Sequence, residues 1–402
     1  MSRQPVSETL DPTSIEDLAE AVRAHNNGAI YPVGAGSWMD LGYPRTKPGI
    51  EISTLQLNRV VDYPHEELTI TVEAGILISE LSKILAEKGQ MLPFDCPYPE
   101  KAALGGLLAT NTSGPRRLAY GTARDSVIGL DVVNAQGERI HGGGRVVKNV
   151  AGYDMPKMHI GALGTLGIIV EATIKVRPMP ESSQAATLVV GPPRLHEACV
   201  AIQNAKLRPV AVEVESPNEL GGEYFTVQLF FEDSREAVAN QMEHVAHLPD
   251  CFVRLPNGKA EQLLERFLDG PSSLLQESTN RMAYQTTWLT AKLSLRPTET
   301  ARAMSAIFEN RNPWKIKAHA LNGVIWVFWR ASDVDEAKQQ VNDLRRIAAD
   351  HRGFASLLKC RAPWKRELPI WGDLGPEIEW MRRLRNSLDP NHVLNPGRFV
   401  VE

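Results

Sequence analysis

The order of apolar and polar residues in the first half of the chain predicts a mixture of helices and strands. Thr13–Glu16 has the form of a capping box, and the apolar positions after it are spaced three and four residues apart as far as His25, which predicts a helix. A second helix is predicted from Ser79 to Lys88, where Gly89 follows. Short apolar runs predict strands at 30–33, 68–73, 128–134, 138–141 and 168–176. We therefore expect an α+β domain.

The second half of the chain repeats one order of elements. Its apolar pattern predicts strand, helix, strand, strand, helix and strand at 187–190, 195–206, 210–215, 224–231, 234–247 and 251–254. The same order is predicted again at 286–295, 298–310, 316–320, 324–330, 334–351 and 355–360. Each set has the β-α-β-β-α-β order of a ferredoxin-like fold. One helix is predicted between the sets, near 260–268, and another at 376–387.

Glycine usage divides the chain. Glycines are concentrated before the proline-bearing segment Arg177–Pro180, and the regular strands and helices follow it. We take this segment as the first domain boundary and the change of character near residue 370 as the second. The predicted parts are 1–180, 181–370 and 371–402.

Composition and charge exclude several classes of protein. The 402 residues are 43% hydrophobic and 23% charged, which is a globular composition. The net charge of -4 gives no strong basic field for nucleic acid. The chain has four cysteines, Cys96, Cys199, Cys251 and Cys360, which lie too far apart in the sequence for a CxxC zinc site or a local iron–sulfur motif. Such sparse use of cysteine predicts that the protein is located in the reducing cytoplasm. The apolar stretch 324–329 is far too short to span a membrane, although docking at the inner membrane through a partner stays open.

The first candidate for a binding segment follows the strand at 30–33. Its residues are Val33, Gly34, Ala35, Gly36, Ser37 and Trp38. Two glycines let successive backbone N–H groups point into one concavity, which suits a diphosphate. Met39 stands where a Rossmann fingerprint would have its third glycine, so that fingerprint is excluded. Taken alone, the segment is equally consistent with a plain tight turn.

Three more glycine-bearing segments follow before residue 180. The second contains Gly105, Gly106, Thr110, Asn111 and Gly114, and the third contains Tyr120, Gly121, Arg124 and Asp125. The fourth runs from Lys148 to Asp154 and continues through Gly164, Gly167, Ile168 and Ile169. Glycine lets a bulky planar ligand press on the backbone, although close packing of helices or strands would also explain the presence of these glycines. Four such segments in one region indicate a large cofactor rather than a single phosphate.

The order of these motifs resembles the PCMH-type FAD-binding domain of the vanillyl-alcohol oxidase superfamily. Ser113–Arg117 and Lys148–Asp154 are similar to the corresponding segments of the FAD-binding E subunits of bacterial glycolate oxidases, and the tail 388–399 is similar to the family's closing motif. The resemblance implies an α+β fold with a PCMH-type FAD-binding domain and a ferredoxin-like α/β cap domain. It also implies that the C-terminal segment packs back on the FAD domain.

The resemblance further implies a role for each segment. Val33–Trp38 would cradle the pyrophosphate, and Gly105, Gly106, Thr110, Asn111 and Gly114 would line the flavin and ribityl region. Tyr120, Gly121, Arg124 and Asp125 would lie nearby, whereas Gly164, Gly167, Ile168 and Ile169 would close over the adenosine. No histidine stands in the first glycine loop, so the FAD is expected to be non-covalent.

The cap departs from related 2-hydroxy-acid dehydrogenases. Their motif His-x-Gly-Asp-Gly-Asn supplies metal and substrate ligands, whereas this chain has only His319–Gly323, without the Asp or a second His. We therefore predict no metal site and assign no catalytic residue.

The leading hypothesis is an FAD-binding subunit of a glycolate oxidase complex, in which glycolate is oxidised to glyoxylate. The expected partners are a sister FAD subunit, an iron–sulfur subunit and a small 2-hydroxy acid. One alternative is a self-sufficient FAD-dependent oxidoreductase for a 2-hydroxy acid or alcohol, with Arg361, His319 and Arg330 as candidate cap residues. The other is a non-catalytic interaction subunit.

Overall fold

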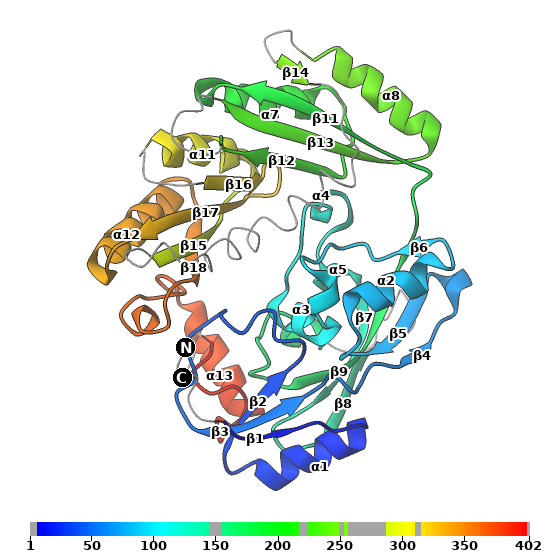
Figure 1. Ribbon diagram of the computed structural model, residues 1–402, viewed down its shortest axis with the longest axis vertical. Coiled ribbons are helices and arrows are strands. Elements are labelled where there is room, and N and C mark those ends of the chain that lie inside the picture. The colour runs from blue at the N-terminus through cyan, green and yellow to red at the C-terminus, as the bar shows by residue number, and fades with distance from the viewer. Residues whose placement is uncertain are drawn as a thin grey trace. The chain divides into compact units, whose positions relative to one another are not determined.

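The computed structural model describes residues 6–144, 155–217, 224–248, 253–255, 287–309 and 315–399. The chain forms two compact units (Figure 1). Unit 1 comprises residues 1–113, 121–179 and 374–402, and unit 2 comprises residues 114–120 and 180–373. The predicted domain boundaries near 180 and 370 stay predictions, and the segment Gly114–Tyr120 belongs to unit 2 rather than to its neighbours in sequence.

Unit 1 contains two main sheets. The first is parallel, with the order β1 (Val6–Leu10), β3 (Gly49–Ser53), β2 (Ala29–Val33). The second is antiparallel, with the order β4 (Val60–Asp62), β5 (Thr69–Glu73), β9 (Ile168–Lys175), β7 (Val127–Val133), β8 (Arg139–Gly143). A short pair joins β6 (Gln90–Met91) to β10 (Arg177–Pro178). The helices are α1 (Ile15–His25), α2 (Ile78–Ala86), α3 (Leu104–Thr110), α5 (Ala123–Ser126), α6 (Pro156–His159) and α13 (Glu377–Leu388).

Helix α1 begins as its sequence predicts. The Ser14 hydroxyl accepts a hydrogen bond from the Asp17 N–H at 3.0 Å, which satisfies a backbone donor of the first turn. The apolar stripe of α1 is buried in a core with residues of β2, β3 and β9. The turn between β7 and β8 packs closely on this helix, because a Cβ atom added to Gly137 would lie 2.5 Å from the carbonyl oxygen of Ala19.

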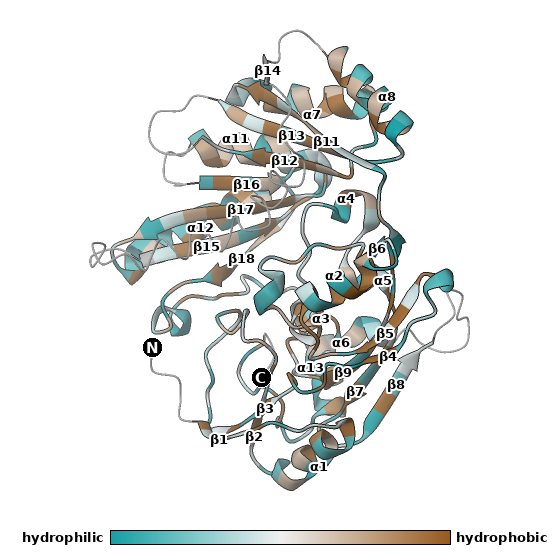
Figure 2. Ribbon diagram, turned by 45° about the vertical axis from the view of Figure 1, so that its right-hand side comes forward, coloured by the Kyte–Doolittle hydropathy of each residue, from teal (hydrophilic) through white to brown (hydrophobic). Residues whose placement is uncertain are grey.

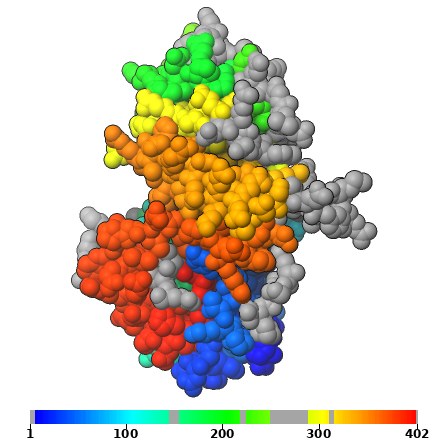
Figure 3. Space-filling model, turned by 90° about the vertical axis from the view of Figure 1, so that its left-hand side faces the viewer, coloured from blue at the N-terminus to red at the C-terminus, as the bar shows by residue number. Residues whose placement is uncertain are grey.

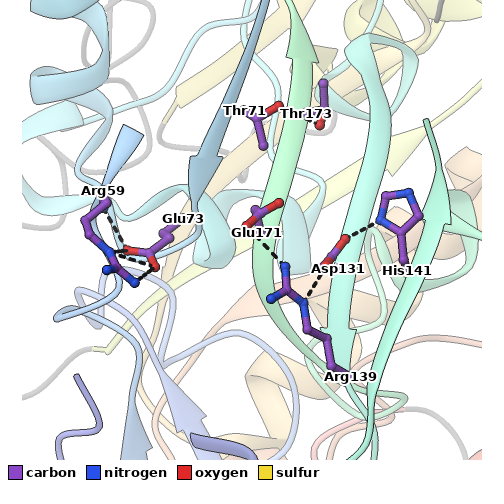
Figure 4. Close-up of polar contacts among 8 residues, drawn as sticks. All are labelled: Arg59, Thr71, Glu73, Asp131, Arg139, His141, Glu171 and Thr173. Carbon is purple, nitrogen blue, oxygen red and sulfur yellow. Dashed lines mark hydrogen bonds and ion pairs between the residues drawn. The ribbon is translucent and has the colours of Figure 1, made fainter. Parts of the chain in front are cut away.

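One face of the antiparallel sheet carries polar side chains in ion pairs (Figure 4). The buried Glu73 carboxylate accepts hydrogen bonds from Arg59, with the shortest at 2.7 Å. Arg139 donates to Asp131 at 2.6 Å and to Glu171 at 3.3 Å. The alternating residues of the same strands, such as Ile70, Val72, Leu130 and Val132, form the main core of unit 1 on the other face.

The C-terminal segment is part of unit 1. The Ile30 N–H donates to the Val393 carbonyl at 2.8 Å, and the Asn395 N–H donates to the Ile30 carbonyl at 2.9 Å. Figure 3 shows this red segment beside the blue N-terminal region. The pairing places the closing turn after α13 next to the end of β2.

Unit 2 is built on one eight-stranded antiparallel sheet. The strand order is β14 (Val253–Leu255), β11 (Ser182–Val190), β13 (Phe225–Asp233), β12 (Ala211–Glu215), β16 (Lys315–His319), β17 (Val324–Ala331), β15 (Thr287–Ser294), β18 (Phe354–Lys359). The long helices α7 (Leu195–Asn204), α8 (Arg235–Ala246), α11 (Thr300–Glu309) and α12 (Val334–Asp350) pack on one face (Figure 1). Figure 2 shows that the strands of this sheet are largely apolar and that its helices carry both apolar and polar residues. The two predicted β-α-β-β-α-β sets meet edge to edge where β12 pairs with β16.

The short helix α4 (Arg117–Tyr120) lies against the sheet of unit 2 and contacts β12. Tyr120 packs against a buried cluster that includes Ala211 and Phe230. The Arg116 guanidinium donates three hydrogen bonds to the buried Glu232 carboxylate, at 2.6 to 3.0 Å. These contacts explain why Gly114–Tyr120 belongs to unit 2. No helix of the described residues is long and apolar enough to cross a membrane.

Candidate functional site

A pocket in unit 1 brings together residues that are far apart in the sequence. Its lining residues come from the end of β2, the start of α3, the segment before β9 and the C-terminal turn. They are Pro32, Val33, Gly34, Ala35, Gly36, Ser37, Trp38, Met39, Thr54, Ala103, Gly105, Gly106, Ala109, Thr110, Leu163, Gly164, Gly167, Ile168, Ile169, Asn395 and Arg398. The pocket therefore unites the first predicted segment with large parts of the second and fourth.

The first glycine loop approaches α3 closely. A Cβ atom added to Gly34 would lie 3.1 Å from the Cβ of Ala103, at the start of that helix. Gly36 has a φ of +77°, a backbone conformation that side chains with a Cβ rarely adopt. Both glycines are thus needed for the path of the backbone around the pocket.

The two adjacent glycines of α3 have different surroundings. A Cβ atom on Gly105 would lie 3.1 Å from the backbone oxygen of Ala74, so this glycine permits close packing of the helix. A Cβ atom on Gly106 would meet no heavy atom of the described residues within 4 Å, although Gly106 lines the pocket. Gly105 therefore fits the packing interpretation, and Gly106 fits the interpretation in which a ligand presses on the backbone.

Two residues that line the pocket, Trp38 and Asn395, each have a buried polar atom without a hydrogen-bond partner among the described residues, and Asn111, which follows the lining residue Thr110 but is not itself part of the lining, has a third. The three atoms are Trp38 Nε1, Asn111 Oδ1 and Asn395 Oδ1. The amide of Asn395 has a defined orientation, because its Nδ2 donates to the Leu163 carbonyl at 2.7 Å. Buried polar groups normally have partners, so one donor and two acceptors are available for a ligand. A cofactor that carries both phosphate oxygens and N–H groups fits this set of one donor and two acceptors, and FAD carries both kinds of group.

Arg398 contributes a half-buried cation to the pocket. Its Nη2 donates to the Trp38 carbonyl at 2.7 Å, which also supports the first glycine loop. Burial, together with the nearby Arg45 charge, lowers the pKa of Arg398 to about 10, so the guanidinium remains charged at neutral pH. The sequence pattern did not indicate that Thr54, Asn395 and Arg398 line the pocket. Residues 395–399 were predicted only to form a turn within the closing motif. The place of Arg398 in that motif was therefore the one feature of the sequence that could have indicated a role in the site.

Several predicted site residues do not line the pocket. Gly114 and Tyr120 belong to unit 2. Asp125 accepts a hydrogen bond from the Thr122 N–H at 2.8 Å and thereby caps α5. Arg124 donates to the Lys157 carbonyl at 3.3 Å, and Gly121 has a φ of +80° beside Asp125. Their contact with FAD stays a prediction, and the segment 148–154 lies outside the described residues.

The hydroxyl of Thr110 already has hydrogen-bond partners in and just after its own helix. Its hydroxyl is 3.0 Å from the Gly106 carbonyl, 3.1 Å from the Leu107 carbonyl and 2.7 Å from the Thr112 hydroxyl. Asn111 follows in the left-handed conformation, with a φ of +48°, and ends α3. A direct hydrogen bond from Thr110 to a ligand would therefore have to replace one of these contacts.

The cap candidates of the sequence analysis have partners within unit 2. His319 lies 2.6 Å from a Glu213 carboxylate oxygen, and its ring meets Trp326 edge-on at 4.4 Å between centroids. The Arg330 guanidinium stacks over Trp288 at 4.2 Å. Among the residues that the structure describes, no group of three or more His, Cys, Asp or Glu side chains could hold a metal ion.

We expect the buried His159 to make the stability of unit 1 dependent on pH. The imidazole is buried behind Gly167, and burial lowers its pKa from 6.5 to about 4. The unfolded chain therefore binds a proton below pH 6.5 that the folded chain does not accept until about pH 4. We expect the free energy of unfolding to fall by about 2 kcal/mol between pH 7.5 and pH 5 on account of this residue.

Denaturant unfolding at both pH values tests this expectation. The variant His159→Phe keeps a planar ring but cannot bind a proton, so its loss of stability between the two pH values should be smaller by that amount. An equal loss in the variant and the parent chain would show that His159 does not cause the pH dependence.

Comparisons with known proteins show what the chain is similar to. A family model described as FAD binding domain matches residues 7–143. Glycolate oxidase subunit GlcE of Escherichia coli is 34% identical over 92% of each chain. D-lactate dehydrogenase of Archaeoglobus fulgidus is 31% identical over 97% of this chain and 90% of that protein. Glycolate oxidase subunit GlcD of Bacillus subtilis is 37% identical, but over only 39% of this chain and 33% of its own length.

A solved structure has the same fold. An alkyldihydroxyacetonephosphate synthase matches 96% of this chain and 75% of its own, with a TM-score of 0.72 and 21% sequence identity. At this identity the likeness supports the fold alone.

Proposed function

Because the chain belongs to the family of FAD-dependent 2-hydroxy-acid oxidoreductases that includes glycolate oxidase subunit GlcE, we propose that it is the FAD-binding E subunit of a glycolate oxidase complex. The predicted family, the α+β fold class with its PCMH-type FAD-binding domain, and the assignment as an FAD-dependent oxidoreductase are confirmed. The observation that carries the finer proposal is the similarity to GlcE over 92% of the chain, which is far more than the FAD-binding domain alone.

In this proposal the lining of the pocket holds FAD. The N–H groups of Val33–Trp38 and the Arg398 guanidinium hold the pyrophosphate, because they place donors and a positive charge together. Gly106 faces the flavin and ribityl part, where a side chain would occupy the space of the ligand. Gly164, Gly167, Ile168 and Ile169 close over the adenosine. Trp38 Nε1 donates to the cofactor, and Asn111 Oδ1 and Asn395 Oδ1 accept from it.

The attachment of FAD is proposed to be non-covalent. None of the described residues that line the pocket is a histidine, cysteine or tyrosine, and the first glycine loop presents Ser37 and Trp38. The bound cofactor supplies the redox chemistry, which is the acceptance of electrons from the oxidation of a CH–OH group. The protein binds and orients the cofactor and shields it from water.

The next electron carrier lies on another polypeptide in this account. The four cysteines of the chain are too far apart in sequence for a local cluster motif, so the iron–sulfur step belongs to a partner subunit. We propose a sister flavin subunit of the GlcD type as the second partner. The cytoplasmic location stays a prediction from the cysteine usage.

A second candidate is a self-sufficient 2-hydroxy-acid dehydrogenase. The similarity to D-lactate dehydrogenase over 97% of the chain favours it. The buried Glu213–His319 pair would then supply the proton acceptor of the cap, instead of the motif that related dehydrogenases carry.

Anaerobic addition of glycolate and D-lactate to the purified, FAD-loaded chain separates the candidates. The flavin band near ~450 nm should persist with the chain alone and bleach when a GlcD-type subunit and an iron–sulfur subunit are added. Dithionite should bleach it in both cases, as a control. Bleaching of the isolated chain by either acid would contradict the subunit proposal in favour of the self-sufficient enzyme, and a chain that binds no FAD would favour an interaction subunit.

A further inference from the structure

Helix α13 carries a row of apolar side chains that unit 1 leaves exposed. Trp380 is 72% exposed, and Met381 and Leu374, which lies just before the helix, are each 43% exposed. Leu384 lies one turn after Trp380 and is only half-buried. Figure 3 shows the red segment that contains α13 on the surface. Large apolar side chains that are exposed together mark an interaction site, and tryptophan is enriched among the residues that dominate binding at protein interfaces.

The opposite side of α13 fixes the helix to unit 1. Arg385 is only 1% exposed, and Ile378, two turns earlier on the same side, is half-buried. Asp389 follows the helix, and its carboxylate accepts hydrogen bonds from the N–H groups of Val393 and Leu394 at 2.9 and 2.8 Å. The exposed row is therefore presented by an anchored helix, and the packing of unit 1 does not use it.

The charges on the two sides of Trp380 are opposite in sign. Glu377 lies three residues before Trp380 and Arg383 lies three residues after it, so both are neighbours of the ring on the helix surface. The Arg383 guanidinium lies over the Trp380 ring, 5.5 Å from its centroid. Arg383 also pairs with Glu379 at 3.1 Å, and both of these side chains are exposed. An acidic group thus precedes the exposed ring, and a basic group follows it.

We propose that this row is a self-complementary surface through which two copies of the chain associate. Two α13 helices pack antiparallel about a twofold axis at Trp380, so that the same patch serves both copies. The two Trp380 rings meet at the axis, and Leu384 of each copy packs near Leu374 of the other. Glu377 of each copy then pairs with Arg383 of the other.

The second copy is the occupant because the complement of the row is present on the row itself. An antiparallel arrangement brings the acidic start of one helix to the basic part of the other, and it does so twice. A helix of 12 residues is about 18 Å long, so the contact lies at the small end of specific interfaces. We therefore expect a reversible dimer whose population rises with protein concentration. The inference goes beyond the proposed function, because each copy keeps its own FAD pocket.

Sedimentation of the full, FAD-loaded chain over about a hundredfold range of concentration tests the dimer. The parent chain should change from monomer to dimer across this range. Trp380→Ser should raise the dissociation constant by about 30-fold or more, because it removes the ring at the centre of the contact. Tyr224→Ser is the matched control, since Tyr224 is an aromatic residue of unit 2 that is 56% exposed, and it should leave the dissociation constant unchanged. The FAD content of each variant shows that it is folded.

An exchange of charges tests the antiparallel arrangement. Glu377→Arg places an arginine opposite Arg383 of the second copy, and Arg383→Glu places a glutamate opposite Glu377 of the second copy. Each variant alone should dimerise more weakly than the parent chain, because like charges then face each other. An equal mixture of the two variants should form a mixed dimer, because both contacts again join opposite charges.

Several results would overturn the proposal. They are a parent chain that stays monomeric at every concentration, a Trp380→Ser chain that dimerises as tightly as the parent, and a mixture of the charge variants that associates no better than either one alone. A monomeric parent chain that binds a GlcD-type or iron–sulfur subunit only when Trp380 is present would also overturn self-association and would assign this surface to the complex.

Discussion

A Gly106→Leu chain should fold normally and fail to bind FAD. A side chain at this position would extend into space that no described residue occupies within 4 Å of the new Cβ, and the glycine lines the pocket. Because leucine is a better helix former than glycine by about 0.8 kcal/mol, helix α3 should not suffer. We expect the affinity for FAD to fall by about 100-fold or more, since the cofactor and the side chain compete for one volume. Quenching of flavin fluorescence on binding measures the change.

The matched control is Gly28→Leu. Gly28 follows α1, and the nearest heavy atom to an added Cβ, the His25 carbonyl oxygen, is 3.8 Å away, so a side chain there is also tolerated. It does not line the pocket. Gly28→Leu should bind FAD as the parent chain does. Equal affinities for Gly106→Leu and Gly28→Leu would place the cofactor elsewhere.

An Arg116→Met chain should lose about 3 kcal/mol of the unfolding free energy of unit 2. The Glu232 side chain is only 2% exposed and accepts three hydrogen bonds from Arg116. Removal of the guanidinium leaves a buried carboxylate without its cation, which costs more than the pair contributes. Denaturant unfolding, monitored by tryptophan fluorescence, measures the change.

Two further variants make the interpretation specific. Arg116→Met combined with Glu232→Met should recover most of the loss, because no uncompensated charge remains. Arg302→Met breaks an exposed ion pair with Glu299 and should cost less than about 1 kcal/mol. A cost for Arg116→Met no larger than that for Arg302→Met would show that the Arg116 contact does not hold Gly114–Tyr120 in unit 2.

The regular elements of the fold could be predicted because their patterns are local. The strand predicted at 286–295 is β15 (Thr287–Ser294), and the helix predicted at 334–351 is α12 (Val334–Asp350). Pairing between the two sets could not be predicted, because the contact of Glu213 with His319 joins residues more than 100 positions apart. The parallel sheet was missed apart from β2. The sequence VSETL of β1 carries little apolar alternation, whereas the alternating Ile50 and Ile52 of β3 were overlooked.

The candidate site was predicted in part for similar reasons. The glycines indicated where the backbone closely approaches either another part of the protein or a ligand. They could not distinguish Gly105, which packs on Ala74, from Gly106, which faces the open space of the pocket. Arg398 reaches the pocket only because the C-terminal segment pairs with β2. Gly114 and Tyr120 were assigned by their neighbours in sequence, and a seven-residue segment has no periodicity to indicate that it belongs to unit 2.

The central claim is that the glycine-lined pocket of unit 1 binds FAD without a covalent bond. The most direct measurement is the flavin content of the purified chain after incubation with FAD and removal of the excess, followed by acid precipitation. The account predicts about one FAD per chain, all of it released to the supernatant when the protein unfolds. Flavin that remains with the precipitate would contradict non-covalent attachment, and a chain without flavin would contradict the site itself.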